Sequence, residues 1–291
     1  MSLPTGSKPL SGGVSVPELS YLTGLHVSES SYSSTHFSKW GVPLDNLRVD
    51  VIDPSFSASI DAALPERSNN TESIFTAFPT LHQKSSDIHI TSPTELTAIF
   101  HTEGAGYKNT FGYYFYDTGA DTILTNADDN SDDSLGYFRP TVVFPNASLY
   151  RKGGELRPGH ARTLRGNRTD GLFENISVGF FVIPNGFNKN LQAVTTGQGY
   201  IVYSTHALNA SADSDSLLPD WQAALSAAST QAQVDQVNAT YSADSRSGIQ
   251  IALFDYGFTS NQKVLCIEDI MRPSGDSDFN DLIVTIKGSP D

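Results

Sequence analysis

A dense group of acidic and amide side chains lies near the C-terminal end of the sequence, between two short apolar runs. The runs are residues 264–267 and 282–286, and both have the length and β-branched composition of strands. The side chains between them that carry oxygen are Glu268, Asp269, Asp276, Asp278, Asn280 and Asp281. Carboxylates at this density repel one another unless a cation or solvent separates them. The segment therefore predicts a loop that closes the last β-hairpin and holds a metal ion.

Calcium is the metal that this set of side chains favours. Hard oxygen ligands without histidine or cysteine suit Ca²⁺ better than Zn²⁺ or copper. Asp276, Asp278 and Asn280 occupy alternate positions, which point the same way if the loop is locally extended. The loop is not an EF-hand, because strands flank it and the glycine and terminal glutamate of that motif are missing. The simpler alternative is a turn built from Asp, Asn, Ser and Gly without an ion.

Two further groups of polar side chains could add ligands. Glu103 and Asn109 lie at the ends of predicted strands, where they either cap turns or share an ion or hydrogen bonds with the C-terminal loop. A second acidic cluster spans residues 117–134, and its alternate positions are Asp128, Asn130 and Asp132. We interpret this cluster as a solvated surface loop, with a weaker second calcium site as the alternative.

Short strand patterns separated by turn signals recur from residue 88 onward. Alternating or apolar runs predict strands at residues 87–90, 95–101, 141–144, 176–183, 199–203 and 249–254, and the aromatic run that ends the stretch 102–116 predicts another. A helix is predicted at residues 217–237, where alanines and an approximate apolar face occur together. A parallel α/β sheet would need helices between the strands. The sequence therefore predicts an all-β fold, a jelly-roll-like β-sandwich with one inserted helix near 218–237.

The first 87 residues have a different character. Residues 1–20 are rich in Ser, Gly and Pro, strands are predicted at 21–27 and 46–52, and residues 53–87 are mixed and polar with several prolines. We predict an N-terminal arm and small docking module over residues 1–87, followed by a calcium-binding β-sandwich domain over residues 88–291. The alternative is that residues 1–87 add an edge sheet to a single domain.

Composition narrows the classes of partner. The chain of 291 residues has a formal net charge of −14, so we expect no binding to nucleic acid or to anionic membranes through bulk charge. Many of its few positive charges lie in residues 150–168, a predicted loop that either contacts an acidic neighbour or a glycan, or balances local acid. No apolar stretch is long enough to cross a membrane, and residues 1–20 lack the apolar region of a Sec signal peptide.

Four motifs occur in the order found in a known family. They are residues 103–114 (EGAGYKNTFGYY), 144–148 (FPNAS), 178–186 (VGFFVIPNG) and the closing Ile267-Glu268-Asp269 with residues 277–281 (SDFND). Through these motifs, residues from about 88 to 287 resemble the domain-of-unknown-function family numbered 4114, which is related to C-terminal domains of exported bacterial surface proteins. The resemblance implies a β-sandwich with bound calcium and a surface, adhesive or structural role, without catalysis. The helical segment at 217–237 departs from the family pattern and resembles an insertion.

These observations predict a non-catalytic, calcium-stabilised structural or binding module, such as a capsid, tail or fibre decoration or attachment protein of a virion. The alternative is an exported bacterial surface adhesin or carbohydrate-binding domain. We expect a virion, extracellular or cell-surface location, with protein partners at residues 1–87 and at the helix near 218–237, and glycans as a second class of ligand.

Two further alternatives stay open. A jelly-roll polysaccharide hydrolase or lyase would use Glu103, Glu174 or Glu268 as acid and base, but no spacing selects a carboxylate pair. An intracellular structural protein without a metal would leave the acidic loop fully solvated.

Overall fold

A computed structural model describes residues 37–44, 46–65, 87–116, 141–204, 209, 227, 229–230, 232–233, 249–255, 261–270 and 275–290. Three predictions fall outside these residues, wholly or for the most part: the strand at 21–27, the acidic cluster at 117–134 with Asp128, Asn130 and Asp132, and nearly all of the helix at 217–237.

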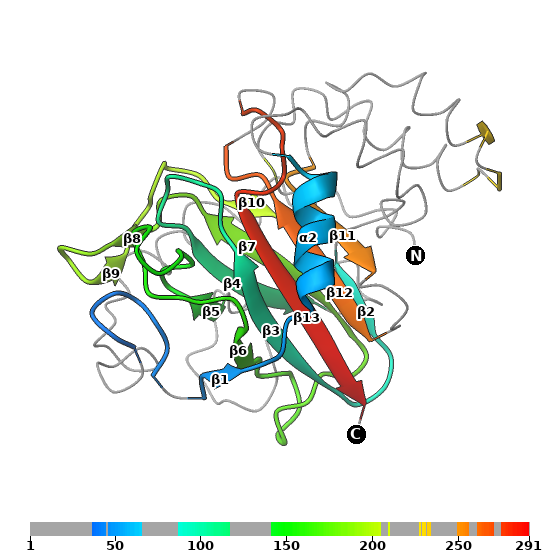
Figure 1. Cartoon of the computed structure of the whole chain (residues 1–291). Coiled ribbons are helices and arrows are strands. Elements are labelled where there is room, and N and C mark those ends of the chain that lie inside the picture. Colours follow the sequence, from blue (N-terminus) through cyan, green and yellow to red (C-terminus); the bar gives the residue numbers. More distant parts are fainter. Residues whose placement is uncertain are drawn as a thin grey trace.

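The described strands form two antiparallel sheets that pack face to face (Figure 1). The first sheet has six strands in the order β1 (Arg48–Val49), β6 (His160–Thr163), β3 (Thr94–Thr102), β13 (Leu282–Pro290), β12 (Gln262–Ile267) and β11 (Ile251–Asp255). The second has the order β10 (Val202–Tyr203), β7 (Ile176–Ile183), β4 (Thr110–Tyr116) and β5 (Thr141–Phe144), and β2 (Ile88–Ile90) also pairs with β7. A short hairpin, β8 (Phe187–Asn188) and β9 (Ala193–Val194), lies beside them.

The core lies between the two sheets and follows from the period-two alternation of the strands. Alternate residues of β13 (Leu282, Val284 and Ile286) and of β7 (Ile176, Val178, Phe180 and Val182) belong to one buried hydrophobic cluster. Rings of Phe111 and Phe180 stack inside it with centroids 6.1 Å apart. Because apolar faces from both sheets meet there, the architecture is a β-sandwich.

The second sheet also has a tightly packed outer face. Gly112 of β4 lies opposite Phe181 of β7, and Tyr114 of β4 lies opposite Gly179 of β7. A Cβ atom on Gly112 would approach the Phe181 ring to 2.3 Å, and one on Gly179 would approach the Tyr114 ring to the same distance. Each aromatic ring therefore occupies the space above the glycine of the neighbouring strand, which explains glycines inside two otherwise apolar strands.

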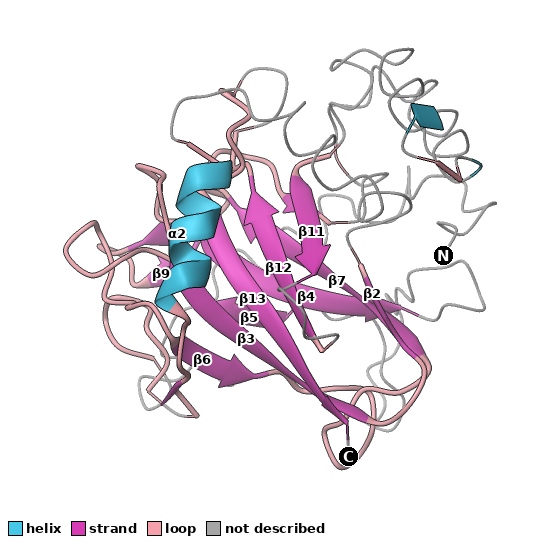
Figure 2. Ribbon diagram, turned by 45° about the vertical axis from the view of Figure 1, so that its right-hand side comes forward, coloured by secondary structure: helices cyan, strands magenta, loops and turns pink. Residues whose placement is uncertain are grey.

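One helix of the described residues, α2 (Pro54–Ala63), crosses the outer face of the first sheet (Figures 1 and 2). Asp53 caps it by accepting a hydrogen bond from Ser55 N at 2.8 Å, and Pro54 occupies its first turn. The Phe56 ring packs edge-on against the His101 ring of β3, with centroids 5.4 Å apart. Among the described residues, no helix is long and apolar enough to cross a membrane.

The all-β sandwich-like fold predicted from the sequence is confirmed. Helix α2 was not predicted, because residues 53–87 were described only as mixed and polar. Two local predictions are wrong: residues 150–168 were predicted to form a loop, but His160–Thr163 form β6, and the strand predicted at 46–52 is reduced to Arg48–Val49. This two-residue strand is the edge of the first sheet, paired with β6. Whether residues 1–87 form a separate docking module stays a prediction.

Candidate metal centre

The registers of the two sheets bring four chain segments to one end of the sandwich. Leu282 at the start of β13 lies opposite Ile267 at the end of β12, and Ile283 lies opposite Thr102 at the end of β3. The segment after β12, the segment before β13 and the segment after β3 therefore meet. In the second sheet, Thr110 at the start of β4 lies opposite Ile183 at the end of β7, which adds Asn109 to the same end of the fold.

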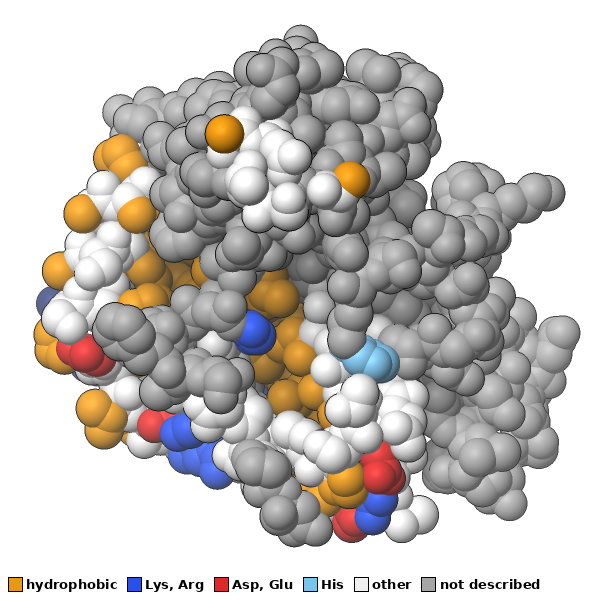
Figure 3. Space-filling view, turned by 90° about the vertical axis from the view of Figure 1, so that its right-hand side faces the viewer, with side chains coloured by type: hydrophobic (Ala, Val, Ile, Leu, Met, Phe, Trp, Pro, Cys, Tyr) orange, Lys and Arg blue, Asp and Glu red, His pale blue; other side chains and the backbone are white. Residues whose placement is uncertain are grey.

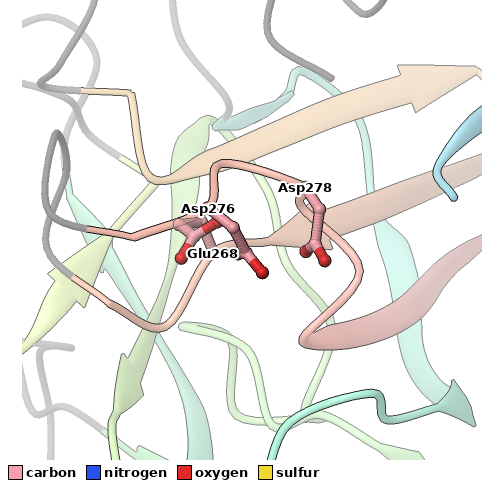
Figure 4. Close-up of side chains that lie close together, drawn as sticks. All are labelled: Glu268, Asp276 and Asp278. Carbon is pink, nitrogen blue, oxygen red and sulfur yellow. The ribbon is translucent and has the colours of Figure 1, made fainter. Parts of the chain in front are cut away.

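Three carboxylates gather in the loop between β12 and β13 (Figure 4). Glu268, Asp276 and Asp278 each offer an oxygen, and these three oxygens all lie within 4.8 Å of one another. Glu268 and Asp278 are buried, with 0% and 2% of their surface exposed, whereas Asp276 is exposed. The cluster therefore has a buried side and a side that faces solvent.

Two side-chain oxygens in the loop between β12 and β13 are buried without a hydrogen-bond donor among the described residues. They are Oε2 of Glu268 and Oδ1 of Asn280. A buried carboxylate or amide oxygen that lacks a donor is costly, because folding removes its water without replacing it. These oxygens are therefore suited to a cation that would take the place of the missing donors.

The neighbouring acids, Asp269 and Asp281, brace the loop through hydrogen bonds. Asn109 Nδ2 donates to Asp269 Oδ2 at 2.6 Å, and Asn185 N donates to Asn109 Oδ1 at 3.0 Å. Asp281 Oδ2 accepts a hydrogen bond from Asp269 N at 2.8 Å. These contacts join the two sheets at the end of the sandwich and fix the position of Asp269 beside Glu268.

Asn280 connects the loop to two other segments. Its Nδ2 donates to the carbonyl oxygen of Leu64, just after α2, at 2.9 Å. Its own carbonyl oxygen accepts a hydrogen bond from Gly104 N at 3.3 Å. The segment before β13 is therefore held between the end of α2 and the turn after β3, where Glu103 is buried and accepts a hydrogen bond from Leu149 N at 3.3 Å.

The backbone of the loop adopts an unusual path that places these side chains. Ser277 and Phe279 both have a φ of +58°, a region that residues other than glycine and asparagine adopt rarely. The Phe279 side chain is fully buried and anchors the turn. A Cβ atom on Gly275 would lie 2.3 Å from Oε1 of Glu268, so only glycine leaves room for this carboxylate.

Burial and mutual repulsion raise the pKa values of the acids in the loop. Burial, followed by the charges of Asp276, Asp278 and Asp269, raises the pKa of Glu268 to about 7. Burial also raises the pKa of Asp269 to about 6, against the opposing effect of its hydrogen bond from Asn109. For Asp281, burial and the charges of Asp269 and Glu268 raise the pKa. The folded loop therefore resists full ionisation when no cation is bound.

The arrangement fits Ca²⁺ by its chemistry. Two ionised carboxylates about 5 Å apart repel each other by roughly 3 kcal/mol at an effective dielectric constant of about 20. A divalent cation bound by Glu268, Asp276 and Asp278 would attract each carboxylate and outweigh their mutual repulsion. Asn280 Oδ1 would add a neutral oxygen ligand. Calcium takes six to eight oxygen ligands in flexible geometries, which suits an irregular loop, whereas Mg²⁺ needs near-octahedral geometry and keeps more of its water.

The structure brings most of the residues predicted from sequence to one end of the fold, in two groups. Glu268, Asp276 and Asp278 bring three oxygens within 4.8 Å of one another, and Asn280 in the same loop has a buried Oδ1 without a donor among the described residues. Asp269, Asp281 and Asn109 form hydrogen bonds in the adjoining part of the loop and at the start of β4. Glu103 lies in the neighbouring turn. Sequence reasoning missed Gly275, Asn185 and the carbonyl of Leu64. Asn185-Gly186 was visible only as a turn signal, and nothing in the sequence pointed to Leu64.

A model of a known protein family matches part of the chain. The model of the family described as "Domain of unknown function (DUF4114)" matches residues 172–289, which include β7, the hairpin of β12 and β13, and the acidic loop. The match begins well after residue 88, so the motifs at 103–114 and 144–148 lie outside it. Neither the curated proteins nor the solved structures contain a match to the chain. Residues 172–289 of this β-sandwich are therefore similar to the DUF4114 family.

Proposed function

We propose that this protein is a non-catalytic β-sandwich module whose terminal loops are held together by Ca²⁺. The observation that supports this most directly is the trio Glu268, Asp276 and Asp278, with three oxygens within 4.8 Å and one buried oxygen of Glu268 that lacks a donor among the described residues. Oxygen–metal bonds would replace the repulsion among these acids.

The role of the ion in this proposal is mechanical. The loop between β12 and β13 contacts α2 through Asn280, the turn after β3 through Gly104, and the start of β4 through Asp269. An ion bound to Glu268 and Asp278 would fix the loop and, with it, these three attachments. Calcium would therefore stabilise the whole end of the sandwich rather than one hairpin.

For the biological setting, we propose display on a virion or on a cell exterior, with a protein partner at the N-terminal segment. The edge strand β1 supports this role. Val49 is 76% exposed in β1 and Val51, just after it, is 91% exposed. Among the described strands, β1 pairs only with β6, which leaves its other edge for pairing with another chain. The alternative, a surface adhesin or carbohydrate-binding domain, is favoured by the exposed basic and aromatic side chains described below.

Catalysis is not part of the proposal. Of the three glutamates considered as acid and base, Glu174 forms an ion pair with Arg168, while Glu103 and Glu268 lie near the proposed ion. A polysaccharide panel offers the relevant test. Turnover that a single carboxylate-to-amide change in Glu103, Glu174 or Glu268 abolishes would replace this proposal by a hydrolase or lyase.

Thermal unfolding tests the calcium part of the proposal. The melting temperature should rise by at least about 5 °C between EDTA and about 2 mM CaCl₂, because an ion that binds only the folded state stabilises it. Asp278→Asn should remove most of this gain. Asp61→Asn makes the same change in charge at an exposed position on α2 and should keep it. Equal melting temperatures with and without calcium in the unmodified protein would refute a calcium site.

A further inference from the structure

A group of six cationic side chains surrounds two aromatic rings on the surface of this acidic protein. Four of them lie on three segments that the fold brings together: the turn at 151–154, the segment at 37–44 and the hairpin of β8 and β9. Asn146 Nδ2 joins the first two by donating to Trp40 O at 2.9 Å and to Gly153 O at 3.1 Å. A Cβ atom on Gly41 would touch the Phe187 ring of β8 at 3.0 Å, which places the third beside them. The cations, which we call the cationic surface, are Lys39, Lys108, Arg151, Lys152, Arg157 and Lys189. Of the two outside these segments, Arg157 follows the turn in sequence, and Lys108 lies beside the turn, with its Cε 3.5 Å from where a Cβ atom on Gly153 would lie.

Two guanidinium groups are held in place by the same ring. The Cζ atoms of Arg157 and Arg151 lie 4.3 Å and 5.2 Å from the centroid of the Tyr150 ring. Tyr150 as a whole residue is 43% exposed. A guanidinium stacked on a ring is held by its face, and its edge stays available to donate hydrogen bonds to a carboxylate. The second ring, Trp40, is contacted by the ammonium groups of Lys189 at 4.9 Å and Lys39 at 5.9 Å.

Within the described residues, none of the six cations forms an ion pair with a carboxylate. Elsewhere, three described cations form ion pairs: Arg48 with Glu95, Arg168 with Asp170, and Lys287 with Asp50. On the face shown in Figure 3, Lys and Arg side chains likewise lie next to Asp and Glu along the lower edge. The nearby acid, Glu155, accepts a hydrogen bond from Ser38 Oγ at 3.2 Å. Unpaired cations that repel one another are therefore concentrated here, in a chain with a net charge of −14.

The turn that carries Arg151 and Lys152 is tightly packed, and its backbone adopts a conformation that is costly for a residue other than glycine. Tyr150 N donates to Leu156 O at 2.7 Å, and a Cβ atom on Gly154 would lie 2.2 Å from Ser148 O, so the turn is packed against its own base. Arg151 has a φ of +69°, in the left-handed region where glycine or asparagine is usual. The surrounding structure must hold Arg151 in this conformation, which is consistent with a functional position.

We propose that the cationic surface binds an acidic polysaccharide, with the guanidinium groups of Arg151 and Arg157 donating to uronate carboxylates and with Tyr150 and Trp40 packing against sugar rings. Pyranose rings present C–H faces that suit aromatic rings, which an acidic peptide lacks. Duplex DNA, with one charge per about 1.7 Å, meets stronger repulsion from an acidic protein than a glycan with one charge per sugar. This inference names a ligand class for the proposed binding module and rests on that proposed role, but it does not depend on the calcium ion.

Titration with a hexamer of galacturonic acid tests the inference, with the full chain in EDTA at low salt and isothermal calorimetry as the readout. The hexamer should bind, and its fully methyl-esterified form should bind at least about tenfold more weakly, because charge-assisted hydrogen bonds are lost. Arg157→Gln should weaken binding of the hexamer about tenfold, and the double variant Arg151→Gln/Arg157→Gln should weaken it further. Arg165→Gln removes an exposed guanidinium outside the cationic surface and should change affinity less than about twofold.

The outcomes separate this inference from the proposed function. Any of three outcomes would overturn the ligand assignment: the hexamer does not bind, its methyl ester binds equally well, or Arg157→Gln and Arg165→Gln lose the same affinity for the hexamer. Tighter binding of an acidic peptide or of single-stranded DNA with the same number of charges would overturn it in favour of that class. An unchanged melting temperature with calcium would refute the ion and leave the glycan assignment standing. Cleavage of the bound hexamer would refute the non-catalytic role alone.

Discussion

Asn280 and Leu64 are separated by more than two hundred residues, yet the Asn280 side-chain amide donates from Nδ2 to the Leu64 carbonyl at 2.9 Å. The same side chain turns its other atom, Oδ1, into a buried position where no described residue donates to it. One amide group therefore binds the end of α2 with its donor and has a buried acceptor left over, and we propose that this acceptor binds the calcium ion. On this proposal, the ion is coupled to the docking of the N-terminal helix on the sheet.

Asn280→Asp should separate the two contacts. The carboxylate keeps an oxygen for the ion but no longer donates to Leu64, whose buried carbonyl then loses its partner at a cost of about 1–3 kcal/mol. With calcium present, we expect metal binding to persist while amide hydrogens of α2 exchange faster. Hydrogen-exchange mass spectrometry and calcium titration measure the two effects. Asn280→Ala should impair both, and Asn190→Asp, at an exposed position, should impair neither. Unchanged exchange of α2 in Asn280→Asp would contradict the coupling.

Gly275→Ala should displace the Glu268 carboxylate. The added methyl group would lie 2.3 Å from Oε1, a distance that forces the side chain or the loop to move. We expect calcium affinity to fall by at least about tenfold, since one of the three clustered carboxylates leaves its place. Gly106→Ala provides the matched control, because nothing lies within 4 Å of its added Cβ. Calcium affinities that agree between the two variants would show that Glu268 does not bind the ion.

The stabilisation by calcium should grow as the pH rises from 5 to 8. Burial raises the pKa of Glu268 from 4.5 to about 7 and that of Asp269 from 3.8 to about 6 in the folded protein. Raised pKa values of acids favour folding at low pH, and this contribution is lost as the pH rises through 6 and 7. The metal-free protein should therefore lose stability over this range, whereas the ion binds the ionised acids.

Melting temperatures in EDTA and in calcium, measured at half-unit steps of pH, give the comparison. The difference between the two conditions should increase with pH, and in Asp278→Asn it should be small at every pH. A difference that is largest at pH 5 would be incompatible with carboxylate ligands of raised pKa.

The strands and the acidic loop were predictable because their signals are local. Residues 141–144 and 176–183 have the composition and length of buried strands, and both strands are found with those bounds. The alternate acids of the loop between β12 and β13 are likewise visible within a few positions. Such patterns need no knowledge of the rest of the fold.

The remaining contacts depend on segments that lie far apart in the sequence. The sequence suggested hydrogen bonds between Asn109 and the C-terminal loop only as one alternative and did not identify Asp269 as the partner, and nothing near Leu64 indicates Asn280, because the tertiary fold creates both contacts. Helix α2 did have a local signal, the cap Asp53 followed by Pro54, but its serines and exposed residues give it no buried face to detect. The polar composition of β6 concealed a strand for the same reason.

A pH dependence of the opposite sign should come from His101, which lies beneath α2. Its Nε2 lies 2.6 Å from Thr285 Oγ1, and burial lowers the pKa of His101 from 6.5 to about 4. A histidine whose folded pKa is lowered stabilises the protein above pH 6.5, and this contribution is lost as the pH falls toward 4, by roughly 3 kcal/mol in total. Acid should therefore weaken the contact between α2 and the sheet.

His101→Gln isolates this effect. The variant should be less stable than the unmodified protein at pH 7, and the gap between their free energies of unfolding should narrow as the pH approaches 4.5. The acids of the metal loop titrate in both proteins, so their contribution cancels in the difference. Urea denaturation in EDTA at pH 7, 6, 5 and 4.5 provides the free energies. A gap that stays constant across this range would mean that His101 keeps the same protonation state in the folded and unfolded chains.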